Sequence, residues 1–221
     1  MIIEARFNGP PGSGNGGYSA GLIAARVPAS GDEVEVTLRR PPPLDTPLSV
    51  EDGVPLSVYD PERHLIAQAS PTRVTIDPVE PVSHAEAVAY SAGYHGFTHH
   101  PFPTCFVCGP DRTPGDGLRI FPGPAGAHRT AAPWQVPPDV SPVMVWAALD
   151  CPGGWAVVSQ ARPYVLGRIA ARVEALPRPG TACTIMGEVG KEEGRKAYVR
   201  STLYSPEGKI LAHATATWIA L

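Results

Sequence analysis

A segment of twelve residues occurs twice in this chain, and this repeat constrains the fold more than any other feature. Residues 58–69 (VYDPERHLIAQA) return as residues 203–214 (LYSPEGKILAHA). Each copy has the pattern of a strand, a proline-containing turn and a second strand, which is typical of a β-hairpin. A chance repeat of such a common pattern is the alternative, but the matching context upstream favours one strand-rich unit that is present twice.

The length of the chain agrees with a duplication. Its 221 residues are enough for two units of about 100 residues, each able to bury a core. We expect an N-terminal unit over residues 1–80, a connecting strap over residues 81–103 and a C-terminal unit over residues 104–221.

Charge and hydropathy exclude several classes of protein. The formal net charge is −3, and the basic residues are scattered along the chain, so we expect no nucleic-acid partner. No apolar run approaches the roughly 20 residues of a membrane span, and the first residues lack the pattern of a signal peptide. We therefore expect a soluble cytoplasmic protein without a membrane partner, in which the four cysteines are reduced.

The residue pattern of the first unit predicts a short strand that ends at Phe7 and a buried helix over residues 18–27. An alternating strand follows from Glu33, then strands around Asp52-Gly53, and then the repeated hairpin, which ends near Ile76. In the strap, a helix over residues 83–92 is expected, because a serine followed three residues later by a glutamate fits a capping box.

The second unit has a similar plan. A strand is expected over residues 117–121 and another around Trp134, followed by a helix over residues 141–150 that has a proline in its first turn. Four further strands are predicted at residues 166–176, 183–189, 197–204 and 210–219. Each unit is thus expected to hold a buried helix against an antiparallel sheet.

Two motifs, together with this plan, resemble the hotdog fold of acyl-CoA thioesterases. Residues 105–110 (CFVCGP) followed by residues 117–121 (GLRIF) are similar to the opening of many single-hotdog thioesterases. Residues 145–150 (VWAALD) resemble the segment of phenylacetyl-CoA-type thioesterases that ends in the catalytic aspartate. The resemblance implies an α+β double hotdog, in which two central helices are wrapped by antiparallel sheet, expected to be one continuous sheet.

The two units complement each other in this resemblance. The family begins the helix with a polar residue and two glycines, which residues 15–17 (NGG) match in the first unit, but Ala24 stands at the carboxylate position. The second unit has Asp150, but residues 141–143 (SPV) replace the glycines. In homodimeric hotdog enzymes the helix start of one subunit faces the carboxylate of the other, so the resemblance implies one composite site.

The chemistry of thioester hydrolysis suggests a role for each of these residues. Backbone N–H groups at a glycine-rich helix start can stabilise the tetrahedral oxyanion, and we assign Gly16 and Gly17 this role. Asp150 either activates a water as general base or attacks the thioester carbon, and both roles stay open. Asn15 is expected to orient the water or the thioester carbonyl.

Structural explanations compete with this hypothesis. An aspartate in an apolar run is often an exposed or capping residue, and residues 151–154 (CPGG) could simply end the helix after Asp150. Residues 12–17 also satisfy G-x-G-x-x-G, but Pro10 and Pro11, and the run of strands that follows, argue against a dinucleotide-binding domain.

A metal site is a further alternative. Cys105 and Cys108 lie close in sequence to His95, His99 and His100. One Cys-x-x-Cys pair is a weak metal signal, and adjacent histidines rarely both reach one tetrahedral ion. We therefore favour a turn without metal, and we expect no cofactor.

The predicted function is hydrolysis of an acyl-CoA or a related acyl thioester at one composite site between the two halves. The rival hypothesis is a non-catalytic hotdog protein that binds an acyl group or another small ligand. A hotdog hydratase ranks lowest, because neither helix carries the expected histidine motif. Exposed sheet edges and the usual association of hotdog units predict a homodimer of double-hotdog chains.

Overall fold

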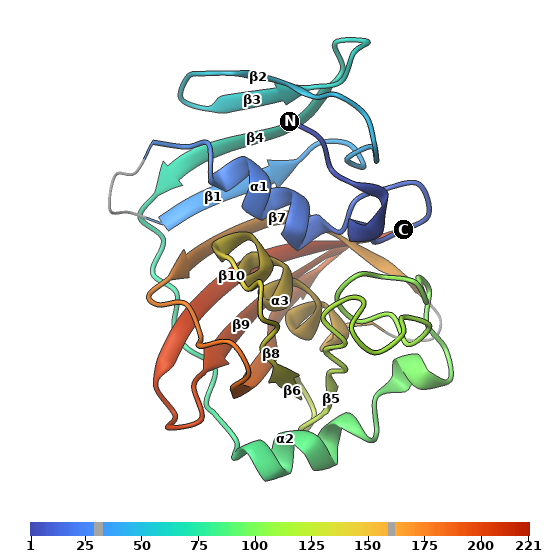
Figure 1. Cartoon of the computed structure of the whole chain (residues 1–221), viewed down its shortest axis with the longest axis vertical. Helices are drawn as coiled ribbons and strands as arrows, with labels where there is room; N and C mark the ends of the chain where they lie inside the picture. Colours follow the sequence, from blue (N-terminus) through green and yellow to red (C-terminus); the bar gives the residue numbers. More distant parts are fainter. Residues whose placement is uncertain (29–32, 159–161) are drawn as a thin grey trace.

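The computed structural model describes residues 1–28, 33–158 and 162–221. Within these residues, ten strands form one antiparallel sheet in the order β2-β3-β4-β1-β7-β10-β9-β8-β6-β5 (Figure 1). The strands are β1 (Glu33–Leu38), β2 (Ser49–Glu51), β3 (Leu56–Tyr59), β4 (Leu65–Thr72), β5 (Gly123–Pro124), β6 (Arg129–Gln135), β7 (Tyr164–Val173), β8 (Ala182–Glu193), β9 (Lys196–Tyr204) and β10 (Ile210–Ala220).

The strand order displays the duplication. β1 pairs with β7 at the junction, and from there β4, β3 and β2 on one side correspond to β10, β9 and β8 on the other. The repeated segments form the β3–β4 and β9–β10 hairpins, whose turns carry equivalent hydrogen bonds from Asp60 N–H to the His64 carbonyl and from Ser205 N–H to the Lys209 carbonyl. The double hotdog and its continuous sheet are confirmed, whereas the domain boundaries stay a prediction.

Two central helices lie side by side on one face of the sheet (Figure 1). α1 (Gly16–Ala24) packs on β1, and α3 (Pro142–Trp155) crosses the strands of the second half. Their apolar residues join one core with the sheet, including Ile23 from α1 and Leu149 from α3, both at most 1% exposed. Because this core spans both halves, the helices are fixed relative to each other at the point where the candidate site lies.

The third helix, α2 (His84–Ser91), lies apart from this pair and packs on β5, β6 and β8. Ser83 and Glu86 form the predicted capping box, in which the Ser83 Oγ accepts from the Glu86 N–H and the Glu86 carboxylate accepts from the Ser83 N–H. The helix expected over residues 83–92 is therefore confirmed.

The expected strand that ends at Phe7 is wrong. Residues Ala5–Phe7 form a 3-10 helix, η1. This segment has loop partners instead of a neighbouring strand, since the Ala5 N–H donates to the Asp45 carboxylate and the Phe7 carbonyl accepts from the Asn15 N–H. The Phe7 ring stacks on Tyr18 of α1 with centroids 3.8 Å apart. The segment thereby closes over the start of α1.

The strand expected over residues 117–121 is also absent from this described stretch. The backbone here follows the loop of residues 105–108, with hydrogen bonds from Leu118 N–H to the Phe106 carbonyl and from Ile120 N–H to the Val107 carbonyl. Between these bonds Arg119 has a φ of 51°, outside the extended region. A regular ladder cannot continue through such a residue.

The helix expected to end at Asp150 continues to Trp155, through Pro152. Proline removes one helical hydrogen bond, but strands of the sheet supply other partners at this turn. The Pro152 carbonyl accepts from the Thr130 hydroxyl at 2.7 Å, and the Gly153 N–H donates to the Ser201 hydroxyl at 3.1 Å. The two glycines that follow the proline also allow this last turn to press against the sheet. The alternative that residues 151–154 end the helix is wrong for this reason.

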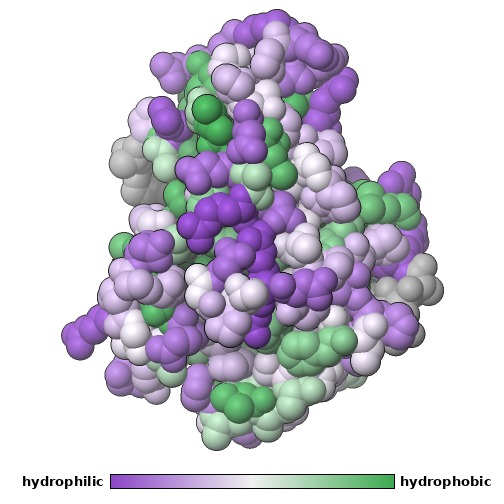
Figure 2. Space-filling model, turned by 45° about the vertical axis from the view of Figure 1, so that its right-hand side comes forward, coloured by the Kyte–Doolittle hydropathy of each residue, from purple (hydrophilic) through white to green (hydrophobic). Residues whose placement is uncertain are grey.

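The molecular surface is mixed in polarity. On the face shown in Figure 2, apolar residues lie in separate groups among polar ones. Among the described residues, no helix has the length and apolar character needed to cross a membrane.

Candidate active site

Asn15 connects the start of α1 to its surroundings. It is the N-cap of the helix, and its Oδ1 accepts from the Tyr18 N–H at 2.8 Å. This geometry directs its Nδ2 group toward α3, where it donates to Asp150 Oδ2 at 3.2 Å and contacts Cys105 Sγ at 3.7 Å. A residue preferred at helix starts for local reasons therefore also provides a donor to the second half of the chain.

Asp150 lies in the middle of α3 and meets the N-terminus of α1. The Gly17 N–H donates to its Oδ2 at 2.9 Å, so this oxygen receives two hydrogen bonds. Its Oδ1 is buried and has no hydrogen-bond partner within the described residues. Asp150 is 2% exposed, so one oxygen of a buried carboxylate is anchored and the other is unpaired.

Burial dominates the electrostatics of this carboxyl group. Loss of solvation raises the pKa of Asp150 from an ordinary 3.8 to about 7, although the hydrogen bonds from Gly17 and Asn15 act in the opposite direction. A group with such a pKa exchanges a proton readily near neutral pH, which is the range where a general base is most effective.

The two glycines of α1 play different parts. A Cβ atom on Gly17 would lie 2.5 Å from the Cβ of Asp150, so glycine is required where the two helices approach. The sequence-based assignment treated both glycines as oxyanion donors, but the Gly17 N–H is engaged by Asp150. The N–H of Gly16 has no hydrogen-bond partner among the residues described, and it is the first of the helix. Gly16 thus keeps the free donor.

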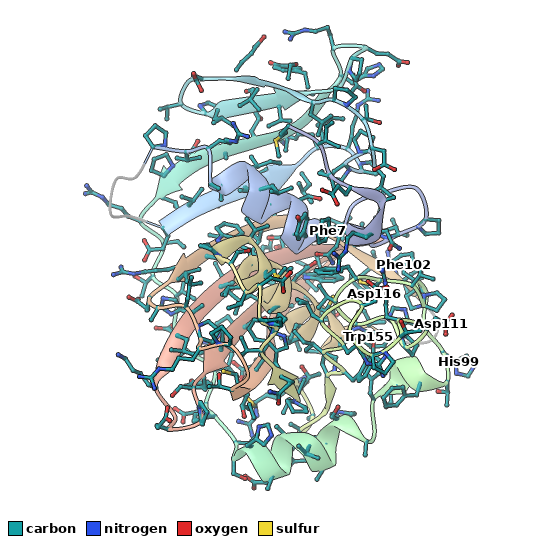
Figure 3. The ribbon with its side chains drawn as sticks, in the orientation of Figure 1. Phe7, His99, Phe102, Asp111, Asp116 and Trp155 are labelled. Atoms are coloured by element: carbon teal, nitrogen blue, oxygen red, sulfur yellow. The ribbon has the colours of Figure 1, made fainter. Side chains whose placement is uncertain are left out.

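A cavity of about 50 Å³ lies at this junction. Its wall includes Asn15, Gly16 and Asp150, together with aromatic side chains such as Phe102 and Trp155. It shares His100 and Trp155 with a neighbouring hollow that is lined by the strap. Figure 3 shows Phe102 and Trp155 on the side where the loop between α2 and β5 covers α3, with His99 at the outer margin.

The structure thus brings together the four residues predicted for the site, which are Asn15, Gly16, Gly17 and Asp150. Sequence reasoning considered His100 only as a possible metal ligand and did not single out Cys151, and both also line the cavity. The position of Cys151 directly after Asp150 was a usable signal, because a neighbour of a site residue on a buried helix is close to the site. Nothing in the sequence distinguishes His100 from the exposed His99.

Two groups of side chains among the described residues could hold a metal ion. Cys105, Cys108 and Cys151 are buried beside Asp150, and their sulfur atoms all lie within 4.8 Å of one another. The other group, Asp60, Glu62 and His64, lies on the β3–β4 turn. That second group is distant in sequence and fold from the cavity, and it serves the turn through a hydrogen bond from His64 N–H to the Asp60 carboxylate.

The fold and the helix junction define a double-hotdog protein with one candidate site. The sequence matches no protein-family profile and no curated protein. Solved structures do match.

The tesB protein of Mycobacterium avium subspecies paratuberculosis has a TM-score of 0.62 and 13% identity, covering 99% of this chain and 91% of that one. A candidate thioesterase from Novosphingobium aromaticivorans has a TM-score of 0.57 and 13% identity, covering 99% and 93%. A hotdog-fold protein of unknown function from Alicyclobacillus acidocaldarius has a TM-score of 0.57 and 12% identity, covering 99% and 91%. At these identities the likeness shows the fold.

Proposed function

We propose that this protein hydrolyses acyl thioesters, with acyl-CoA as the substrate class, where the N-terminus of α1 meets Asp150. One observation carries the proposal: a buried carboxylate has one oxygen anchored by the Gly17 N–H and the other unpaired, in a cavity at a helix start. The name of the similar Novosphingobium protein, a candidate thioesterase, supports the same reaction class.

The unpaired Oδ1 of Asp150 performs the first chemical step. As a general base, it takes a proton from a water that attacks the thioester carbon, and a pKa of about 7 suits this role at neutral pH. As a nucleophile, the same oxygen attacks the carbon, the C–S bond breaks and the thiol of CoA leaves, and the resulting mixed anhydride is then hydrolysed by water. A single turnover in heavy-oxygen water tests the nucleophilic route, because label enters the Asp150 side chain only when water opens the anhydride at the Asp150 carboxyl carbon.

The N–H of Gly16 stabilises the oxyanion that forms on the thioester carbonyl. It is the first donor of α1, and the positive end of the helix dipole lies behind it. A donor of this kind contributes about 2.7–4 kcal/mol to transition-state stabilisation. In this proposal Asn15 and Gly17 act as positioning residues that hold Asp150 beside the developing charge.

The experiment is release of free thiol from a panel of short, long and aromatic acyl-CoAs. We expect turnover by the wild type and its loss in Asp150→Asn, which keeps the shape and the acceptor for Gly17. Asp139→Asn is the matched control, because Asp139 is exposed in the loop before α3, and it is expected to keep wild-type activity. Equal activity of Asp150→Asn and wild type refutes the proposed role of Asp150.

The rival function is binding of an acyl group without turnover. It is established if the wild type binds an acyl-CoA in calorimetry but releases no thiol from any member of the panel. Light scattering on the purified protein tests the predicted homodimer in the same preparation.

A further inference from the structure

Three buried cysteines meet beside the candidate active site. Cys105 and Cys108 lie in the loop between α2 and β5, and Cys151 lies in α3. All three side chains line the same cavity as Asp150, and their sulfur atoms lie within 4.8 Å of one another. The third thiol comes from a segment more than 40 residues away, so the Cys-x-x-Cys pair on its own did not reveal the cluster.

The spacing of the sulfur atoms suits a single metal ion. Zinc bound tetrahedrally by thiolates has bonds of about 2.3 Å, which places pairs of sulfur ligands about 3.8 Å apart. From separations of at most 4.8 Å, each pair has to close by about 1 Å at most. Side-chain rotation of buried cysteines is enough for such an adjustment.

Several N–H groups point at these sulfur atoms. The Trp155 indole N–H donates to Cys108 Sγ at 3.4 Å, and the Asn15 amide donates to Cys105 Sγ at 3.7 Å. A neutral thiol is a weak acceptor, and N–H donors placed at Cys105 and Cys108 favour the thiolate form that a metal ion binds.

His100 belongs to this layer of donors. Its Nδ1 accepts from the Phe102 N–H at 2.8 Å, so the proton of the neutral ring is on Nε2. The Nε2–H group lies 3.4 Å from Cys108 Sγ and donates to it. The structure therefore places His100 as a donor to a sulfur ligand, while His95 and His99 are exposed.

The turn that presents the first two cysteines is also constrained. The Gly109 N–H donates to the Cys105 carbonyl at 2.9 Å. A Cβ atom on Gly109 would lie 2.5 Å from the backbone nitrogen of Cys105, so only glycine permits this tight turn. The turn directs both sulfur atoms inward toward Cys151.

We propose that Cys105, Cys108 and Cys151 bind one Zn²⁺ ion as thiolates, with the fourth ligand position facing the cavity. Buried negative charge is paired or coordinates a metal, and three thiolates favour a soft ion such as zinc. Three protein ligands and an open fourth position are the arrangement of zinc sites that bind water or substrate. The ion connects the loop to α3. This proposal replaces the sequence-based preference for a turn without metal.

The test is the metal content of protein purified without chelators or metal-affinity resins, measured by mass spectrometry of the elements. We expect about one zinc per chain in the wild type and loss of zinc in Cys151→Ser. The matched control is Cys183→Ser, because Cys183 is buried on β8 outside the cluster and contacts the Thr181 hydroxyl at 3.8 Å. This control is expected to keep its zinc.

Two further measurements keep the test decisive if a cysteine variant fails to fold. Cobalt added to metal-stripped wild-type protein is expected to give the thiolate charge-transfer bands and the visible bands of a tetrahedral site. Trp155→Phe removes one donor to Cys108 and is expected to weaken zinc affinity about 10–100-fold, whereas His99→Ala leaves it unchanged.

A wild type that contains no zinc and takes up neither zinc nor cobalt overturns the proposal. Unchanged zinc content in folded Cys151→Ser does the same, and so does a disulfide between two of the three cysteines in protein prepared without oxidant. The measurement needs no substrate, so the zinc site stands or falls separately from thioester hydrolysis.

Discussion

The burial of Asp150 predicts that this carboxyl group reduces the stability of the fold at neutral pH. Its pKa is raised from an ordinary 3.8 to about 7 in the folded protein. Below about pH 4, both the folded and the unfolded chain carry the proton. Between the two pKa values the unfolded chain releases it while the folded chain retains it, so the free energy of unfolding falls as pH rises.

The size of this effect follows from the displacement of the pKa. Each pKa unit corresponds to about 1.36 kcal/mol, so moving the Asp150 pKa from 3.8 to about 7 costs about 4 kcal/mol once both states are ionised. Between about pH 5 and pH 8, roughly 3 kcal/mol of this loss occurs. That is a large part of the 5–15 kcal/mol by which ordinary domains are stable, as a rough range.

The assay compares wild type with Asp150→Asn in urea unfolding at a series of pH values. An amide does not titrate, so the difference in unfolding free energy between the two proteins is expected to change by about 3 kcal/mol in favour of the variant as pH rises from about 5 to 8. Burying the amide can also cost a fixed free energy. Such a cost shifts the difference in unfolding free energy equally at every pH, so the expected change of about 3 kcal/mol between pH 5 and pH 8 is unaffected.

A difference curve that is flat with pH refutes the reasoning, because it means that Asp150 ionises equally in both states. A difference that changes in the opposite direction shows that the hydrogen bonds from Asn15 and Gly17 outweigh burial. Asp139→Asn, at an exposed site, controls for the loss of one negative charge.

Three other predictions concern the supports of the site. Gly17→Ala places a Cβ atom 2.5 Å from that of Asp150 and is expected to cost about 1–3 kcal/mol in urea unfolding, whereas Gly190→Ala, with no contact nearer than 3.7 Å, stays within about 0.5 kcal/mol. Asn15→Ala removes a cap and a donor to Asp150, so we expect a loss of about 1 kcal/mol and an upward shift in the midpoint of the pH–rate profile. Ser83→Ala breaks the capping box of α2 and is expected to cost about 1 kcal/mol of stability without changing thiol release.

The parts of the fold that local patterns determine could be predicted from the sequence. The hairpins of the repeat formed where their strand and turn residues placed them, and Ser83 and Glu86 capped α2 as their spacing indicated. The meeting of Asn15 and Gly17 with Asp150 was predictable only through the resemblance to hotdog enzymes, because 133 residues separate Gly17 from Asp150.

The remaining errors arose where distant segments override a local pattern. Pro152 is expected to stop a helix, but Thr130 and Ser201 from the sheet provide hydrogen bonds that allow α3 to continue. The residues around Phe7 have the pattern of a strand, but the Phe7 ring stacks on Tyr18 and the segment does not pair with a strand. Cys151 joins the other two thiols through tertiary packing that no spacing in the sequence encodes.

The pairing of β1 with β7 has a consequence for how such a protein behaves and evolves. In a hotdog enzyme built from separate subunits, this junction is bimolecular and is lost on dilution, whereas here it is intramolecular and independent of protein concentration. Because the two halves are covalently linked, the first half always packs against the second half, whose sequence is different. Under the proposed function, a change that would disable an identical pair can be tolerated in one half, and Ala24 can therefore stand where the other half has Asp150.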